Sequence, residues 1–444
     1  MGIVSTLVAS CPGLEAIAWG DLEPGDDWHR NWHDRLTASC YPHETPGAIA
    51  FPRTQAELAT AARVACENGW RVIPCGRGSK LHWGGLVRGA ALAISTEKLD
   101  RVVEHAADDF TLTVEAGVAM ATIDELLRAR NQRLAIDPTR PESATIGGVV
   151  ATADTGSLRQ RYGGLRDRLI GIQFVRHDGE IAKAGGRVVK NVAGYDLMKL
   201  FTGSYGTLGT IAQLTFRLYP VPEASQTTIA QGEPEDIDRF ARAIASSSLT
   251  PVAFDLIGPS LVQSLELGGR LAAVLKFETV EASLADQSQR TLELAERCGL
   301  RVRVCDEREA ENFWAQGRDR LDRATDEGCT VKFGTRSTAA IEALLACDRL
   351  FKDNSAAIVH YRSGLGRAAI ARDLGGNRLA NWRRVCEDNG GFLSVLSAPL
   401  ALRQAAAAGQ FDLWGARDGA RRVMGQIAAR FDPDRRYSPG RFLV

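Results

Sequence analysis

The sequence predicts an α+β protein with two or three folding units. At 444 residues the chain exceeds the roughly 250–300 residues at which a single core stops growing. Residues 54–95 read as an amphipathic helix followed by two short apolar strands, which is typical of a small βαβ unit. Residues 111–219 carry period-two strands and a hairpin turn, and a helix-then-strand pattern repeats after Pro222. A parallel piece, a larger antiparallel sheet and a separate second region are therefore expected.

The elements of the first region follow from local signals. Thr54 to Glu57 forms a capping box, in which Thr caps the helix and Glu, three residues later, reaches back to the cap. Strands are expected over 71–74 and 91–95, on either side of a glycine loop. A strand is expected over 111–115, and a helix over 122–130 that Thr122 opens.

The next strands are marked by their turns. Residues 170–176 and 181–182 flank His177-Asp178-Gly179-Glu180, and Asp-Gly at a tip predicts a hairpin. A strand over 210–219 is ended by Pro220 and Pro222. The later region contains the helix and strand pairs 284–298 and 301–305, 339–351 and 356–361, and 379–389 and 392–397, and then a last helix over 416–431.

Composition excludes several classes of protein. Lysine plus arginine equal aspartate plus glutamate at 54 each, so no global field attracts nucleic acid or an anionic membrane. Nine dispersed cysteines without a Cys-x-x-Cys pair indicate thiols in a reducing cytoplasm, not disulfides or iron–sulfur ligands. No apolar run approaches the ~18–20 residues of a membrane span. Two histidines near Trp28 and Trp32 lack the further ligands that a metal site needs.

Glycine turns are the strongest functional signal. Glycine permits positive φ and lets main-chain N–H groups approach a ligand closely. An ordered series of such turns indicates backbone wrapped around a large ligand, and a glycine-rich β protein without a cofactor is the alternative. The turns are Pro74-Cys75-Gly76-Arg77-Gly78-Ser79-Lys80, Thr145-Ile146-Gly147-Gly148, 161–164, 191–197 and 201–209.

These turns, with Phe431-Asp432-Pro433 and Pro439-Gly440-Arg441 near the end, resemble the vanillyl-alcohol oxidase (PCMH) superfamily of FAD-binding proteins. Within it, the nearest likeness is to the FAD-binding subunit of glycolate oxidase (glycolate dehydrogenase). The resemblance implies a two-subdomain PCMH-type FAD-binding domain and an α+β antiparallel-sheet cap domain. The implied segments are a leader (1–44), the FAD-binding domain (45–222), the cap (223–415) and a C-terminal segment returning to the FAD domain (416–444).

The resemblance also implies which residues hold FAD. Ser79 stands where some relatives carry a histidine that bonds covalently to the flavin, so noncovalent FAD is expected. Asp154 departs from the family pattern, and a side chain at Gly147 is expected to cost more in FAD affinity than in folding. The implied cofactor-binding residues are Cys75, Gly76, Arg77, Gly78, Ser79, Lys80, Pro138, Thr139, Thr145, Ile146, Gly147, Gly148, Asp154, Gly156, Gly206, Gly209, Ile211 and Arg441.

No catalytic base is assigned. Relatives that oxidise 2-hydroxy acids by themselves carry a histidine-rich cap segment that supplies a base and a metal site, and this chain lacks it. The nearest segment is His360 to Gly364; a single histidine ending a strand usually satisfies a local hydrogen bond. We therefore expect no metal.

The favoured function is the FAD-binding subunit of a glycolate dehydrogenase complex, which oxidises glycolate to glyoxylate beside a second flavin subunit and an iron–sulfur subunit. The expected location is the cytoplasm, and partners could hold the complex at the inner membrane. Two alternatives stay open. One is a stand-alone FAD enzyme for another hydroxy acid or alcohol, and the other is a non-catalytic scaffold that holds flavin for assembly.

Overall fold

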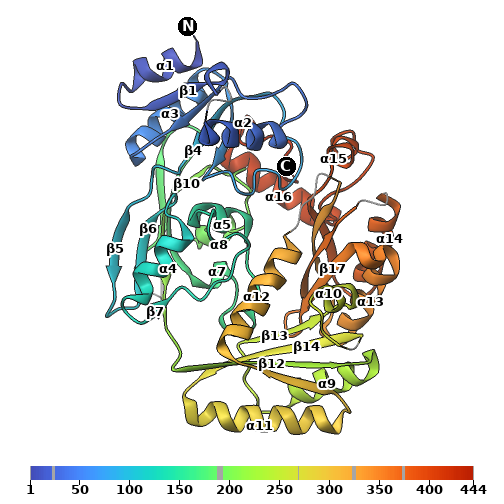
Figure 1. Cartoon of the computed structure of the whole chain (residues 1–444). Coiled ribbons are helices and arrows are strands. Elements are labelled where there is room, and N and C mark those ends of the chain that lie inside the picture. The colour runs from blue at the N-terminus through green and yellow to red at the C-terminus, as the bar shows by residue number, and fades with distance from the viewer. Residues whose placement is uncertain are drawn as a thin grey trace. The chain divides into compact units, whose positions relative to one another are not determined.

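The computed structural model describes residues 2–22, 26–187, 194–268, 270–322, 327–372 and 376–443. The chain divides into two compact units, each with its own buried cores (Figure 1). The first unit contains Met1–Thr155, Gly164–Val221 and Ala416–Val444; the second contains Gly156–Gly163 and Pro222–Gly415. Residues 1–44, expected as a leader, thus belong to the first unit, and residues 156–163 join the second.

The first unit begins with the expected βαβ arrangement. Its four-stranded sheet has the order β1 (Glu15–Ala18), β2 (Ala48–Phe51), β4 (Ala90–Ser95), β3 (Arg71–Cys75). Strands β2, β4 and β3 are parallel, whereas β1 is antiparallel to β2. Helix α3 (Gln55–Glu67) connects β2 to β3 and buries its apolar face in the core of this sheet.

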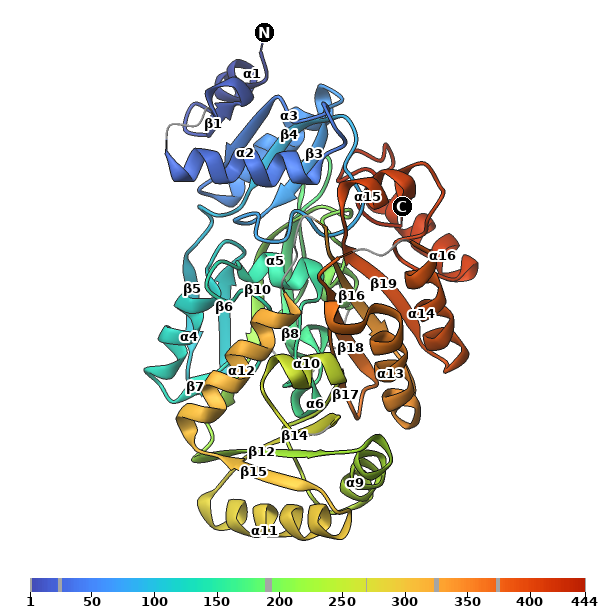
Figure 2. The ribbon, with the colours of Figure 1, turned by 45° about the vertical axis from the view of Figure 1, so that its right-hand side comes forward.

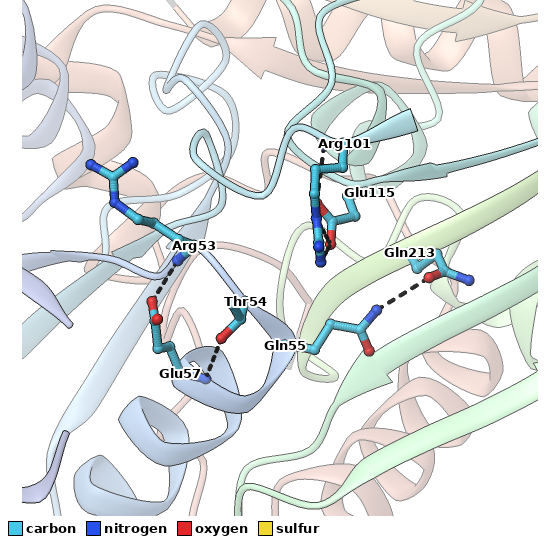
Figure 3. A network of polar contacts seen from close by, with 7 residues as sticks. All are labelled: Arg53, Thr54, Gln55, Glu57, Arg101, Glu115 and Gln213. Carbon is cyan, nitrogen blue, oxygen red and sulfur yellow. Dashed lines mark hydrogen bonds and ion pairs between the residues drawn. The ribbon is translucent and has the colours of Figure 1, made fainter. Parts of the chain in front are cut away.

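Helix α3 begins where the sequence predicts, but its capping box is only half formed. Thr54 Oγ1 accepts a hydrogen bond from the main-chain N–H of Glu57 at 3.1 Å. The Glu57 carboxylate accepts instead from the N–H of Arg53 at 2.7 Å. Gln55 Nε2 donates to Gln213 Oε1 at 3.2 Å, which ties the start of α3 to the second sheet (Figure 3).

The second sheet of this unit is antiparallel, as predicted. Its order is β5 (Val102–Ala106), β6 (Thr111–Glu115), β10 (Thr210–Arg217), β8 (Leu169–Val175), β9 (Ile181–Gly185). The Asp-Gly hairpin joins β8 to β9, and Gly179 in its turn has φ +86°. At the end of β6, the buried carboxylate of Glu115 accepts hydrogen bonds from the main-chain N–H, Nε and Nη2 of Arg101 (Figure 3).

Shorter elements complete the unit. They are α1 (Ile3–Ser10), α2 (Asp27–Ser39), α4 (Met120–Arg128), α5 (Ile146–Thr152), α7 (Leu165–Arg168), α8 (Leu197–Phe201), β7 (Gln132–Arg133), β11 (Tyr219–Pro220) and α16 (Asp418–Phe431). The predicted start of α4 at Thr122 is wrong. Met120 N donates to Ala144 O at 3.1 Å, and this tertiary contact starts the helix two residues earlier.

The C-terminal tail forms part of the first sheet. Val72 N in β3 donates to Arg436 O, and Ser438 N donates back to Val72 O, both at 2.8 Å. Gly85 N then donates to Arg441 O at 2.8 Å. The tail therefore runs beside β3 and brings Arg441 to the glycine turn that follows this strand.

The second unit is one eight-stranded antiparallel sheet with helices on both faces. Its order is β15 (Arg301–Cys305), β12 (Ala224–Gly232), β14 (Leu271–Thr279), β13 (Ala253–Ile257), β17 (Ser355–His360), β18 (Leu365–Ile370), β16 (Cys329–Gly334), β19 (Phe392–Ser397). Helices α9 (Pro234–Ser246), α11 (Glu281–Arg297), α13 (Ala340–Phe351) and α14 (Gly376–Asp388) share one core with this sheet, and Figure 2 shows them along it.

Helices α10 (Pro259–Ser264) and α12 (Glu307–Leu321) pack on residues of the opposite face. Side chains alternate between the two cores, so Leu256 and Val359 lie in one, and Ile257 and Ile358 lie in the other. The short helices α6 (Arg159–Tyr162) and α15 (Leu400–Ala407) complete the unit. The helices of the described residues include none that is long and apolar enough to cross a bilayer.

Candidate functional site

The first unit contains a cavity whose space, open solvent included, is about 730 Å³. Its walls come from the end of β3 and the glycine turn, the start of α5, the loop before β10, and the C-terminal tail. The fold thus brings together segments that lie far apart in the sequence.

Most of the residues that the sequence proposes for FAD line this one cavity. They are Cys75, Gly76, Arg77, Gly78, Ser79, Lys80, Thr145, Gly147, Gly148, Gly206, Gly209, Ile211 and Arg441. The lining does not include Pro138, Thr139, Ile146, Asp154 or Gly156. It does include Pro74, Leu81, Thr96, Ala151, Thr152, Ser204, Tyr205 and Thr210, which sequence reasoning did not propose.

The turn after β3 is built to hold an anion. The main-chain N–H groups of residues 76–80 make no hydrogen bond to any described residue. Gly78 has φ +77°, which favours glycine, and a Cβ at Gly76 would collide with Thr145 Oγ1. Successive unpaired N–H groups form a concave site for phosphate oxygens, so the turn fits the pyrophosphate of FAD.

Two buried cations add to this site. Lys80 Nζ lies 3.0 Å from Asp154 Oδ2, and the exposed fractions of the two side chains are 6% and 0%. This contact is an ion pair without hydrogen-bond geometry, and Lys80 has no other polar partner among the described residues. Asp154 Oδ2 also accepts from the N–H and Oγ1 of Thr139 at 3.0 and 2.8 Å. Asp154 therefore lies behind the wall and positions Lys80.

Arg441 is the second buried cation. Its Nη1 donates to Leu81 O at 2.9 Å and to Trp83 O at 3.2 Å. Its Nε and Nη2 have no partner among the described residues, and burial lowers the pKa of its guanidinium. An unpaired buried donor is costly, so a bound anion would satisfy it.

The start of α5 forms a side-chain-free wall. Ile146 N donates to Val118 O at 2.9 Å, and Gly147 N donates to Ala116 O at 2.8 Å. A Cβ at Gly147 would lie 2.7 Å from the Cβ of Ala116, whereas one at Gly148 would meet only Thr145 Oγ1, at 3.2 Å. The expectation that a side chain at Gly147 costs more in FAD affinity than in folding does not fit this geometry, because the added Cβ would collide with Ala116.

The histidine of the cap lies in a buried hydrogen-bonded chain. His360 Nδ1 lies 2.7 Å from Asp255 Oδ1, and both side chains are buried. Ser157 Oγ donates to the other oxygen of Asp255. The contact agrees with the interpretation of His360 as a locally satisfied residue. Across the described residues, no three His, Cys, Asp or Glu side chains are grouped as a metal site would require.

Residues 46–185 match the family described as FAD binding domain. The matched segment contains the turn with free N–H groups, Lys80, Asp154 and the wall at Gly148. The match of residues 46–185 to this family indicates FAD as the cofactor. The cavity walls at 204–211 and at Arg441 lie outside the matched segment.

Curated relatives resemble part of the chain. Glycolate oxidase subunit GlcD of Bacillus subtilis is 30% identical over 54% of this chain and 54% of the relative. A probable mitochondrial D-lactate dehydrogenase of Danio rerio is 34% identical over 44% and 39%. D-2-hydroxyglutarate dehydrogenase of Xanthomonas citri is 28% identical over 62% and 57%. The chain spans about half the length of these curated relatives.

Solved structures show the fold over nearly the whole chain. The 4-ethylphenol oxidase of Gulosibacter chungangensis has a TM-score of 0.73 at 15% identity, covering 99% of this chain and 96% of that one. An alkyldihydroxyacetonephosphate synthase has a TM-score of 0.69 at 16% identity, covering 98% and 84%. The PCMH-type fold implied by the sequence resemblance is thereby confirmed.

FAD should be released completely when the protein is precipitated with acid. Ser79 cannot form the covalent flavin bond that a histidine makes, and burial raises the pKa of the nearby Cys75 thiol to about 12, so this thiol is not a nucleophilic thiolate. The measurement is the flavin absorbance of the supernatant and the pellet. Yellow colour that stays with the pellet would contradict noncovalent binding.

Proposed function

We propose that the protein is the FAD-binding subunit of a 2-hydroxy-acid dehydrogenase complex that oxidises glycolate to glyoxylate. The observation that carries the proposal is the cavity with five free N–H groups and two buried cations, in a chain whose relatives are named glycolate, D-lactate and D-2-hydroxyglutarate oxidoreductases. The names of these relatives support an FAD-dependent hydroxy-acid oxidoreductase, and we propose glycolate as its substrate and a multi-subunit complex as its setting.

Oxidation of a 2-hydroxy acid removes a hydride, that is one proton with two electrons, from C2 and a proton from the hydroxyl group. Bound FAD supplies the two-electron acceptor. The chain's own part is to hold this cofactor: residues 76–80 would donate N–H groups to the pyrophosphate, and Lys80 and Arg441 would balance its charge. Gly148 would leave room for the cofactor beside α5.

The proton must be taken by a base within about 2.6–3.2 Å of the hydroxyl group. In the described part of the second unit, His360 is the histidine that could serve as a base, and its Nδ1 is hydrogen-bonded to the buried Asp255. This contact leaves Nε2 of His360 available, so our assignment of the base to a partner flavin subunit rests on the histidine-rich cap segment that the sequence lacks. If electrons leave through an iron–sulfur cluster, another chain must hold it, because the nine cysteines are free thiols and, within the described residues, none belongs to a metal-ligand group.

The isolated subunit should bind FAD but should not oxidise glycolate or D-lactate. Dye reduction should appear only when the partner subunits are co-purified. His360→Ala should reduce the rate of the complex by less than about tenfold, because losing a general base costs ~10²–10⁴. The same variant should lower the melting temperature, since Asp255 loses a buried hydrogen-bond partner.

Two other results would favour the stand-alone enzyme or the non-catalytic scaffold. Steady turnover of a hydroxy acid by the isolated chain, abolished by His360→Ala, would show a stand-alone enzyme with His360 as its base. A complex that keeps full turnover when this subunit cannot bind FAD would show a scaffold. FAD content is measured in every preparation, so failure to load cofactor is distinguished from failure to turn over substrate.

A further inference from the structure

A second cavity adjoins the glycine turn in the first unit, and its space, open solvent included, is about 820 Å³. Its wall comes from α2, from the turn itself and from the residues after β4. The lining residues are Trp28, Asn31, Trp32, Arg35, Arg77, Glu97 and Lys98. Arg77 lines both this cavity and the one assigned to FAD.

Two guanidinium groups of this wall form no close ion pair within the described residues. Arg35 is half-buried, its Nη1 donates to Arg77 O at 2.5 Å, and burial lowers the pKa of its guanidinium. Within the described residues, neither Arg35 nor Arg77 lies at ion-pair distance from a carboxylate. Lys98 differs, because its Nζ lies 2.5 Å from Glu15 Oε1. Two arginines with free donors therefore face the same space.

Glu97 is the carboxylate of the wall, and Lys98, Arg77 and Arg35 all act on it, so one carboxylate opposes three cations. Burial raises the pKa of Glu97, and Trp28 donates a hydrogen bond to its side chain. The site thus carries an excess of positive charge in a partly buried place. Planar guanidinium groups with free N–H donors recognise carboxylates and phosphates in a bidentate manner.

An aromatic surface lies beside these cations. Trp28 packs against Phe51 with ring centroids 5.2 Å apart and meets Trp32 edge-on at 6.5 Å. The exposed fraction of Trp28 is 36%, whereas Trp32 is buried. The indole of Trp28 is therefore held by packing while part of it still faces solvent, and it offers an apolar surface for a flat group.

We propose that this second cavity binds a small oxyanion, a carboxylate or a phosphate, in the forks of Arg35 and Arg77, with its apolar part against Trp28. Such a site is separate from FAD and does not depend on the proposed enzymatic function. The lining residues combine charge with an apolar surface. The guanidinium groups of Arg35 and Arg77 would anchor the anion, and the indole of Trp28 would favour ligands with a flat body.

The test is isothermal titration calorimetry of the FAD-loaded protein with phthalate, acetate and inorganic phosphate. Phthalate should bind at least tenfold more tightly than acetate, because it has two carboxylates and a flat ring. Arg35→Gln should weaken binding of the anion at least tenfold. Arg30→Gln should not, since Arg30 lies on the same helix with 55% of its side chain exposed, beside Asp27 and outside the cavity. Binding of phosphate rather than phthalate would support the site and assign a phosphate ligand.

Trp28→Ala provides a second test if Arg35→Gln fails to fold. This variant should weaken the binding of phthalate about tenfold or more and change the affinity for phosphate less than twofold. Absence of binding by all three probes would overturn the proposal, as would wild-type affinity in both variants. Binding to the FAD-free protein alone would also overturn it, because the cavity would then belong to the cofactor.

Discussion

Gly148→Val should weaken FAD binding without unfolding the protein. A Cβ at this position meets only Thr145 Oγ1 at 3.2 Å, and Gly148 lines the FAD cavity, so the valine methyl groups would occupy cofactor space. Forcing extra methyl groups into an occupied site costs about 1–3 kcal/mol, so FAD affinity should fall about 5- to 150-fold. Flavin fluorescence titration of the refolded apoprotein measures the affinity, and thermal melting of the apoprotein measures stability.

Gly147→Val is the matched control, because it changes the adjacent residue in the same way. Its side chain would collide with Ala116, whose Cβ and carbonyl oxygen lie 2.7 and 2.8 Å from the added Cβ. The apoprotein should therefore lose stability by about 1–3 kcal/mol, a loss that Gly148→Val should not show. Wild-type FAD affinity in Gly148→Val, or equal loss of stability in both variants, would contradict the assigned cavity wall.

Strands with a strong local pattern could be predicted from the sequence. The strands over 111–115, 301–305 and 392–397 have the predicted bounds, because period-two patterning and flanking turns fix them locally. The start of α4 could not be predicted, because the hydrogen bond from Met120 to Ala144 is a tertiary contact. The assignment of residues 156–163 to the second unit could not be predicted either, since no local signal marks it.

In the candidate site, too, some features could be predicted from local sequence and others depend on tertiary contacts. Glycine turns reveal where backbone approaches a ligand, and the turn at 76–80 lines the cavity. Thr96 and Thr210 line it as well, but the direction of a threonine side chain at the end of a strand depends on the neighbouring segments. The position of Asp154 behind Lys80 likewise depends on how the segment at 137–156 packs against the glycine turn.

Asp154→Asn should strongly destabilise the FAD-free protein. The amide keeps an oxygen that can accept from Thr139, so the substitution removes mainly the charge that Lys80 faces at 3.0 Å. Breaking a buried ion pair by removing one partner costs about 3–5 kcal/mol, because the remaining charge stays buried and uncompensated. Urea unfolding of the apoprotein gives this free energy; a loss below ~1 kcal/mol would contradict a buried pair.

A double-mutant cycle with Lys80→Met separates the ion pair from the packing of Asp154. If the cost of Asp154→Asn comes from the stranded ammonium group, removing that group should restore part of the stability, with a coupling of at least about 1 kcal/mol. FAD should also stabilise Asp154→Asn more than it stabilises the wild type, because the pyrophosphate would supply the negative charge that Lys80 has lost. Lys80→Met should bind FAD about tenfold more weakly, since it lacks this cation. Additive effects in the cycle, with equal stabilisation of both proteins by FAD, would show that Lys80 neither depends on Asp154 nor faces the cofactor.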